Sequence, residues 1–230
     1  PEIDYKEGSF MKVLVIAPHP DDETIGAGGT LLGHIARGDE LFWCVVTQNY
    51  PPNWSEDKRV RALEQIAQVR KILGFQDVFR LGFPTVKLNT VPHIDLCTAL
   101  QKVVDQCKPD IVYTSSRNDP NLDHRIVHDG TLVAVRPLPG NTVRRVLCYE
   151  IGYTQYFGHH SGASAFQPNV FVDITPYIEQ KLSAMDCYKT QLCQAPHPRT
   201  VEGIRLLSRS RGLSVCCEYA ECFELVRELL

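Results

Sequence analysis

One imidazole and three carboxylates stand side by side in the segment APHPDDE, residues 17–23. This segment continues the apolar run VLVIA, which is typical of a buried strand, so a strand ends here and releases four ionisable side chains into one short loop. The charged side chains of such a cluster repel one another and are costly to remove from water, and a bound cation would neutralise the negative charge. His19, Asp21 and Asp22 therefore predict one half of a metal site.

A second polar segment offers the remaining ligand. A divalent-metal hydrolase needs about three protein ligands and one open coordination position. His19 and Asp22 can reach one ion from a tight turn, which leaves Asp21 free to hold a water molecule. The segment NDPNLDHRIVHD, residues 118–129, supplies His124 near the start of a predicted helix. The other ionisable side chains considered in this segment are Asp119, Asp123 and His128.

Apolar runs alternate with stretches of helical spacing along most of the chain. Strands are predicted at residues 12–17, 40–47, 77–81, 110–115, 143–151 and 169–174. Helices are predicted at 24–37, 55–73, 93–107, from about 124, and at 175–194, 200–211 and 219–229. The alternation predicts an α/β fold, a mainly parallel Rossmann-like sheet with helices on both faces. Ligands bind beyond the carboxyl ends of such strands, so the loops at 18–23 and 116–124 are expected at one edge, with the metal site.

The bulk properties exclude several classes of protein. A length of 230 residues predicts a single domain over residues 11–230, preceded by residues 1–10 as a native extension or a remnant of expression. The net charge of −3 gives no general attraction to nucleic acid, and no apolar run reaches the ~20 residues of a transmembrane helix. The nine cysteines are odd in number, form no CxxC and mostly lie in apolar surroundings, which predicts reduced thiols in a cytoplasmic protein. The oligomeric state stays open, a homo-oligomer included.

Other motifs have simpler explanations. GAGG, residues 26–29, is similar to a dinucleotide-binding loop, but the carboxylates before it would repel a phosphate, so the glycines predict close packing of a helix on the sheet. An N-cap role for Asp21 or Asp22 would leave His19 unexplained. The segment 152–168 is predicted to be a long loop that covers the site as a substrate lid. A structural zinc site from Cys187, Cys193, Cys216 and Cys217 would lack the usual paired spacing.

The sequence resembles the PIG-L/LmbE-like family of zinc-dependent N-deacetylases. The resemblance rests on APHPDDE, the Asp123-His124 pair, the arginine-rich helix that leads to Leu73-Gly74, YAECF at 219–223, the stretch 166–191 and PHPR at 196–199. It implies that zinc, or another divalent ion, is held by His19, Asp22 and His124, with Asp21 as the general base. The implied reaction removes an N-acyl group, N-acetyl above all, from an amino sugar or a glycosylated small molecule.

One position departs from the family pattern. Many members carry HPDH, whose first histidine is usually assigned to transition-state stabilisation or proton donation. Asn121 stands there in this chain, and asparagine can donate a hydrogen bond to an oxyanion but cannot act as an acid. The histidines that could substitute are His128, His159, His160 and His197. Asn121 also keeps open a catalytically weak or inactive, metal-bearing sugar-binding protein, whereas a phosphoesterase would need a second metal or more cationic side chains at the site.

The resemblance further implies an arginine and a glutamate on the helix of residues 55–73. Arg61 and Glu64 match that spacing, and an arginine beside Asp21 would hold it ionised and oriented. Arg59 and Arg70 compete for this role. Without special roles, Arg61 and His128 are expected to be solvent-exposed residues of their helices.

Overall fold

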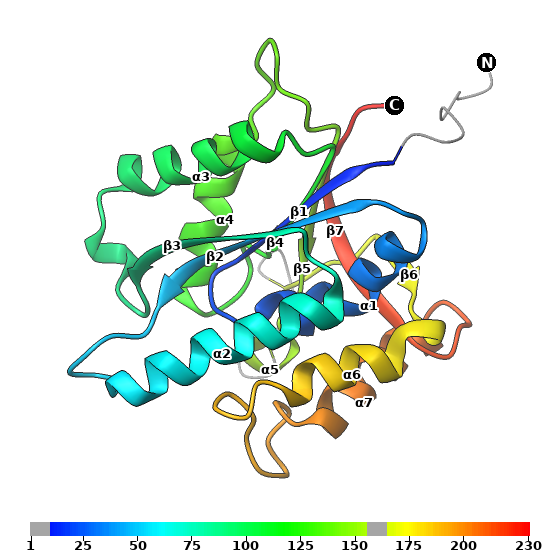
Figure 1. Cartoon of the computed structure of the whole chain (residues 1–230). Helices are drawn as coiled ribbons and strands as arrows, with labels where there is room; N and C mark the ends of the chain where they lie inside the picture. The colour runs from blue at the N-terminus through cyan, green and yellow to red at the C-terminus, as the bar shows by residue number, and fades with distance from the viewer. Residues whose placement is uncertain (1–9, 156–164) are drawn as a thin grey trace.

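A sheet of seven strands runs through the middle of the molecule in the order β3-β2-β1-β4-β5-β7-β6 (Figure 1). The structure is a computed structural model and describes residues 10–155 and 165–230. The strands are β1 (Lys12–Ala17), β2 (Glu40–Gln48), β3 (Asp77–Pro84), β4 (Ile111–Ser115), β5 (Arg145–Tyr149), β6 (Val170–Asp173) and β7 (Ala220–Glu228). The helices are α1 (Asp22–Ala36), α2 (Glu56–Leu73), α3 (His93–Cys107), α4 (Leu122–Ala134), α5 (Gly152–Gln155), α6 (Ile178–Asp186) and α7 (Val201–Leu213), with 3-10 turns η1 (Leu88–Thr90) and η3 (Thr175–Tyr177).

The sheet is mainly parallel. The strands from β3 to β5 pair in parallel, and only β7 runs antiparallel, between β5 and β6. Helices cover both faces, with α3 and α4 on one and α1, α2, α6 and α7 on the other (Figure 1). Successive residues of β1 alternate between two cores, Val13 and Val15 in one and Leu14 and Ile16 in the other. The predicted fold class is confirmed.

The glycines at the start of α1 let this helix lie against the sheet. A Cβ added to Gly26 would overlap the ring of Tyr149 on β5, and one added to Gly29 would come within 2.7 Å of Ile174. Tyr149 is fully buried, and its hydroxyl donates a hydrogen bond of 2.8 Å to the carbonyl of Ile16. The prediction that these glycines allow close packing, rather than dinucleotide binding, agrees with this geometry.

A buried ion pair, formed by one residue of α6 and one of β7, contacts the middle of α1. Nζ of Lys181 on α6 lies 2.7 Å from Oε1 of Glu221 on β7, and the two side chains are 2 % and 3 % exposed. The ammonium also donates to the carbonyl of Ile25 at 2.9 Å. The carboxylate accepts from the amides of Gly29, at 2.8 Å, and Thr30, at 2.7 Å. In a regular helix the amide of Gly29 donates to the carbonyl of Ile25. The ion pair therefore contacts both groups of this backbone hydrogen bond.

Two C-terminal predictions were wrong. Within the predicted helix 219–229, Ala220–Glu228 form strand β7, because pairing with β5 and β6 outweighs their helical spacing and glutamate content. Helix α6 ends at Asp186 instead of near 194, and the chain turns beyond it so that Tyr188 is fully buried. Helix α2 is capped at both ends, since Ser55 accepts from the amide of Lys58 and Gly74 adopts a left-handed conformation.

Other predictions have mixed outcomes. The predicted lid, 152–168, begins with the short helix α5, and residues 156–164 lie outside the described part. None of the helices in the described ranges is long and apolar enough to cross a membrane. All nine cysteines are free thiols. Those buried in the core are Cys44, Cys97, Cys107, Cys148 and Cys222.

Candidate metal centre and its cleft

Two loops meet at the carboxyl ends of the neighbouring strands β1 and β4. The loop after β1 carries His19, and the loop after β4 leads into α4, whose first turn carries His124. Nδ1 of His19 lies 3.1 Å from Nε2 of His124, although 105 residues separate them in sequence. Strand order reverses between β1 and β4, which is where ligands bind in open sheets of this kind. The predicted proximity of these loops is confirmed.

Asp22, the first residue of α1, completes a group of three. Its Oδ2 lies 3.3 Å from Nδ1 of His19 and 3.4 Å from Nε2 of His124. One ligand atom from each of the three residues lies within 4.8 Å of the other two. Oδ1 of Asp22 is buried and has no hydrogen-bond partner within the described ranges. Two imidazole nitrogens and a carboxylate with an orphaned oxygen form a donor set that fits a divalent ion such as zinc.

A carboxylate stands behind each histidine. Nε2 of His19 lies 3.1 Å from Oδ2 of Asp123, and Nδ1 of His124 lies 3.0 Å from Oδ2 of Asp119. Asp119 also accepts a hydrogen bond of 2.6 Å from the hydroxyl of Thr154 on α5. The hydrogen bond with Asp123 fixes the ring orientation and tautomer of His19, so its Nδ1 remains available to a metal. Asp119 lies within ion-pair distance of Nδ1 of His124 but makes no hydrogen bond to it, and Nε2 of His124 faces Asp22 and His19.

The electrostatics of this group favour a positive charge. Burial opposes protonation of His19, but hydrogen bonds with Asp123 and Asp22 outweigh it and raise the pKa of His19 to about 10. Burial likewise opposes ionisation of Asp22, but the imidazoles of His124 and His19 hold the pKa of Asp22 below its ordinary value. Surroundings that stabilise an imidazolium also stabilise a metal cation in its place.

Asp21 stands beside the three and lines a cleft. It has a φ of 112°, a region that residues other than glycine rarely adopt, and its amide donates to Oε2 of Glu23 at 3.2 Å. Burial and then the carboxylate of Asp22 hold the pKa of Asp21 well above its ordinary range. The guanidinium of Arg199, 3.7 Å from Oδ2 of Asp21, opposes that shift. A metal ion next to Asp21 would also oppose this rise in its pKa and would favour the ionised carboxylate.

A family model described as PIG-L: GlcNAc-PI de-N-acetylase matches residues 14–135, more than half of the chain. This chain belongs to the PIG-L family. The match spans β1 to α4 and therefore includes both loops of the metal centre.

Two curated relatives are deacetylases by name. The probable N-acetyl-alpha-D-glucosaminyl L-malate deacetylase 2 of Bacillus anthracis is 25% identical over 190 residues, which cover 78% of this chain and 80% of the relative. The diacetylchitobiose deacetylase of Thermococcus kodakarensis is 27% identical over 201 residues, covering 78% and 70%.

Solved structures share the fold over nearly the full chain. The conserved protein TT1542 from Thermus thermophilus superposes with a TM-score of 0.78 at 26% identity, covering 96% of this chain and 97% of the other. GalB, the 4-carboxy-2-hydroxymuconate hydratase of Pseudomonas putida, has a TM-score of 0.75 at 19% identity, covering 96% and 98%. The second likeness shows the fold alone, so this PIG-L fold does not by itself specify the reaction.

The cleft next to the metal centre has a volume of about 330 Å³. His19 and Asp21 lie at one end of it, together with Asn121. Its walls come from the end of β2, from α2 and β3, and from the segment after α6 that carries Arg199. Its volume is within the range typical of small-molecule sites.

Asn121, at the position where many PIG-L members have histidine, is the N-cap of α4. Its side-chain oxygen accepts from the backbone amide of Asp123 at 3.0 Å, and the backbone amide of Asn121 donates to Oδ1 of Asp119 at 2.8 Å. The cap uses the carboxamide oxygen, so the NH₂ group is the donor that Asn121 can offer in the cleft.

Arg61 does not lie beside Asp21. Its side chain is 61% exposed and pairs with Asp57, one turn earlier on α2, at 2.9 Å. Arg199 occupies the place that the sequence analysis gave to an arginine of α2. Arg199 belongs to the PHPR segment, but nothing in the spacing of the sequence connects it to residue 21, so no role could be predicted for it.

The alternative arginines and histidines are also placed by the structure. Arg59 lines the cleft and pairs with Glu56, whereas Arg70 donates to the carbonyl of Phe75 at the end of α2. His128 is buried and its Nδ1 lies 3.0 Å from the carbonyl oxygen of Ser115, so the expectation of an exposed residue was wrong. His197 is exposed, and its Nδ1 accepts from the amide of Arg199. His159 and His160 lie outside the described residues.

Glu23 supports the loop from behind, a role that the sequence did not reveal. Its Oε1 accepts hydrogen bonds of 2.6 Å from the hydroxyls of Tyr188 and Thr24. Burial raises the pKa of Glu23 to about 7, against the hydrogen bonds that lower it. Through its other oxygen Glu23 holds the amide of Asp21, so the strained residue is fixed from the side opposite the cleft.

Proposed function

We propose that this protein is a zinc-dependent hydrolase that removes an N-acetyl or similar N-acyl group from an amino sugar or glycosylated small molecule. The arrangement of His19, Asp22 and His124, with an orphaned carboxylate oxygen, is the observation that carries the proposal. Membership of the PIG-L family and the names of the two curated deacetylases support the substrate class. Another divalent ion with the same ligand preferences could replace zinc.

The residues divide the chemistry among them. Zinc at this site would supply a Lewis acid and lower the pKa of a bound water towards ~7. Asp21 would take a proton as water attacks the amide carbonyl, and would return it to the leaving nitrogen as the C–N bond breaks. The products are the free amine of the sugar and acetate. Asn121 would donate a hydrogen bond to the developing oxyanion, and Arg199 would keep Asp21 ionised and oriented.

The free, largely buried thiols also support a reducing compartment, so we propose a cytoplasmic location. A catalytically weak or inactive sugar-binding protein is the second candidate. Asn121 favours it, because the position holds no acid that could protonate the leaving amine.

Metal content and amine release decide between these functions. The zinc-loaded protein should contain about one ion per chain, which His19→Ala should lose, and should release amine from N-acetylglucosamine conjugates. Asp21→Asn should lower kcat by ~10²–10⁴-fold while the metal stays bound, since it removes the base and not a ligand. Asp105→Asn is the matched control, because Asp105 is an exposed carboxylate on α3.

Three outcomes would contradict the proposal. Full activity of Asp21→Asn would exclude it as the base. Full activity after exhaustive chelation would exclude metal-dependent hydrolysis. Zinc binding without turnover over a broad panel of N-acyl sugars would favour the sugar-binding protein.

A further inference from the structure

The cleft has a cationic wall, although the whole chain carries a net charge of −3. Four of the residues that line it are the cations Lys58, Arg59, Arg80 and Arg199, whereas Asp21 is the single carboxylate among them. A metal ion at one end would add further positive charge. A small cavity with this balance attracts anions and disfavours cations.

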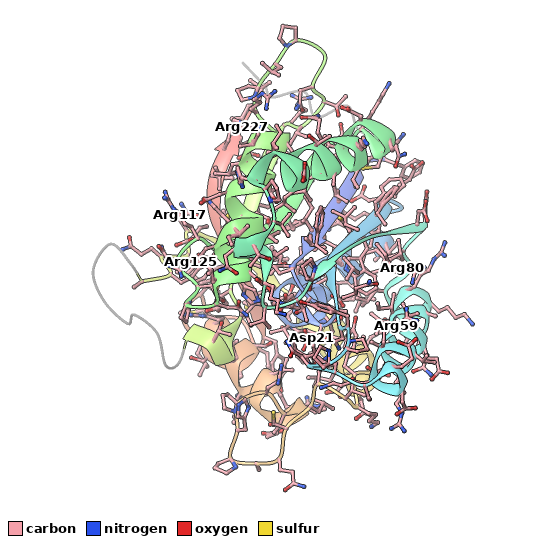
Figure 2. All side chains as sticks on the ribbon, turned by 90° about the vertical axis from the view of Figure 1, so that its left-hand side faces the viewer. Asp21, Arg59, Arg80, Arg117, Arg125 and Arg227 are labelled. Carbon is pink, nitrogen blue, oxygen red and sulfur yellow. The ribbon has the colours of Figure 1, made fainter. Side chains whose placement is uncertain are left out.

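The fold creates this wall from two elements, α2 and β3. On α2, Lys58 is followed at four-residue spacing by Ala62 and Ile66, so a single face of the helix lines the cleft. Arg80 comes from β3, where Phe79 and Leu81 pack into the core under α3 and α4, so alternation turns Arg80 towards the α2 side. Figure 2 shows Arg59 and Arg80 on one side of Asp21 and Arg117 and Arg125 on the other.

Two of the four cations have no internal counterion. Arg59 pairs with Glu56 through Nε at 2.9 Å, and Arg199 lies near Asp21. Lys58 and Arg80 have no carboxylate within ion-pair distance in the part of the chain that the structure describes. Cations gathered in one concave site repel one another, and this repulsion is relieved by a bound anion. Lys58 and Arg80 line the same cleft from α2 and β3, so one ligand bound in the cleft can contact both.

We propose that the cleft binds a phosphate ester of the N-acylated amino sugar, with Lys58 and Arg80 as contacts to the phosphate; this inference rests on the proposed function. A phosphate monoester carries a charge of about −1.5 to −2 at neutral pH and has three strong acceptor oxygens, so it can engage an ammonium and a guanidinium together. A carboxylate carries a single charge and needs fewer cations.

Two matched substrates test the inference, N-acetylglucosamine 1-phosphate and methyl N-acetylglucosaminide, with amine release as the assay. The zinc-loaded protein should show a kcat/KM at least ~10-fold higher for the phosphate. Arg80→Gln and Lys58→Gln should each reduce this preference by about 10-fold, because each removes a charge-assisted hydrogen bond. Arg117→Gln removes the same charge from a side chain that is 72% exposed and outside the cleft, and should keep the preference.

Several results would overturn the inference. These are equal kcat/KM for the two substrates, a preference that survives both cleft variants, an equal loss in Arg117→Gln, and release of inorganic phosphate in place of amine. N-acetylglucosaminyl phosphatidylinositol in detergent distinguishes a glycolipid from a soluble sugar phosphate. Faster, Arg80-dependent turnover of N-acetylglucosamine 1-phosphate supports the inference, whereas faster turnover of the glycolipid, whose phosphate is a diester on the inositol, overturns it.

Binding separates this inference from the proposed function. If neither substrate releases amine, the proposed hydrolysis fails and calorimetry with N-acetylglucosamine 1-phosphate decides the remaining question. Binding that Arg80→Gln weakens about 10-fold supports the phosphate site. Absence of binding, or binding that Arg80→Gln leaves unchanged, overturns the inference of a phosphate site.

Discussion

Breaking the buried ion pair that contacts α1 should have a large effect on stability. Lys181 and Glu221 are 2 % and 3 % exposed, so the ammonium has almost no access to water when its partner changes. Glu221→Gln removes the negative charge and keeps an oxygen that can accept from Gly29 or Thr30. The variant therefore removes the charge together with one of the two hydrogen bonds to the helix, because the NH₂ group of glutamine cannot accept.

The size of the effect follows from the burial. Removing one partner of a buried pair costs about 3–5 kcal/mol, because it leaves an uncompensated charge. For a chain of 230 residues each kcal/mol lowers the melting temperature by about 2–4 °C, so Glu221→Gln should melt about 10 °C earlier. The double variant with Lys181→Met should recover part of this loss, since no buried ammonium remains.

Thermal and urea unfolding, followed by circular dichroism at fixed metal content, measure these differences. Glu179→Gln is the matched control, because Glu179 pairs with Arg205 on the surface and its side chain is 75% exposed. Its melting temperature should equal that of the wild type. A loss below about 1 kcal/mol in Glu221→Gln, or a double variant no more stable than the single one, would refute this account.

Three further predictions concern other parts of the structure. Asp119→Ala should weaken zinc affinity by about 10–100-fold, measured by chelator competition, because His124, a proposed ligand, loses the carboxylate that lies 3.0 Å from its Nδ1; unchanged affinity would contradict this. Gly26→Ala should lower the free energy of unfolding by about 1–3 kcal/mol because its Cβ would overlap the ring of Tyr149. Gly33→Ala, whose Cβ would meet an atom no closer than 3.4 Å, should be neutral or stabilising, and equal effects would show that packing is not the cause. Burial and Arg37 lower the pKa of His34 below its usual 6.5, against Asp39, which raises it. Below that pH the unfolded chain binds a proton that folded His34 does not, so stability should fall as the pH drops below 6.5, with a smaller slope in His34→Gln; identical slopes would exclude this residue as the source.

The local half of the site could be predicted from the sequence because its residues are neighbours in the chain. APHPDDE after an apolar run gave His19, Asp21 and Asp22 together. The rule that strand ends share an edge gave the loop of His124 as the second half, and the 3.1 Å separation of the two histidines agrees with it.

The rest depends on contacts between distant elements. Arg199, Tyr188 and the cationic pair of Lys58 and Arg80 reach the site only because α6 and its following segment, α2 and β3 pack around it. The error at 219–229 has a similar origin. A short stretch of mixed spacing fits helix or strand, and the partners β5 and β6 that decide between them lie elsewhere in the chain.

The position of β7 has a consequence for the order of folding. This strand is the last of the seven described strands in sequence order, yet it lies between β5 and β6, and its Glu221 accepts from amides of α1 that are 191 and 192 residues earlier. During synthesis α1 therefore emerges from the ribosome long before the carboxylate that satisfies its interior. Such late, non-local closure is expected to slow folding and to leave the nascent sheet with an open edge beside β5 until β7 has been synthesised.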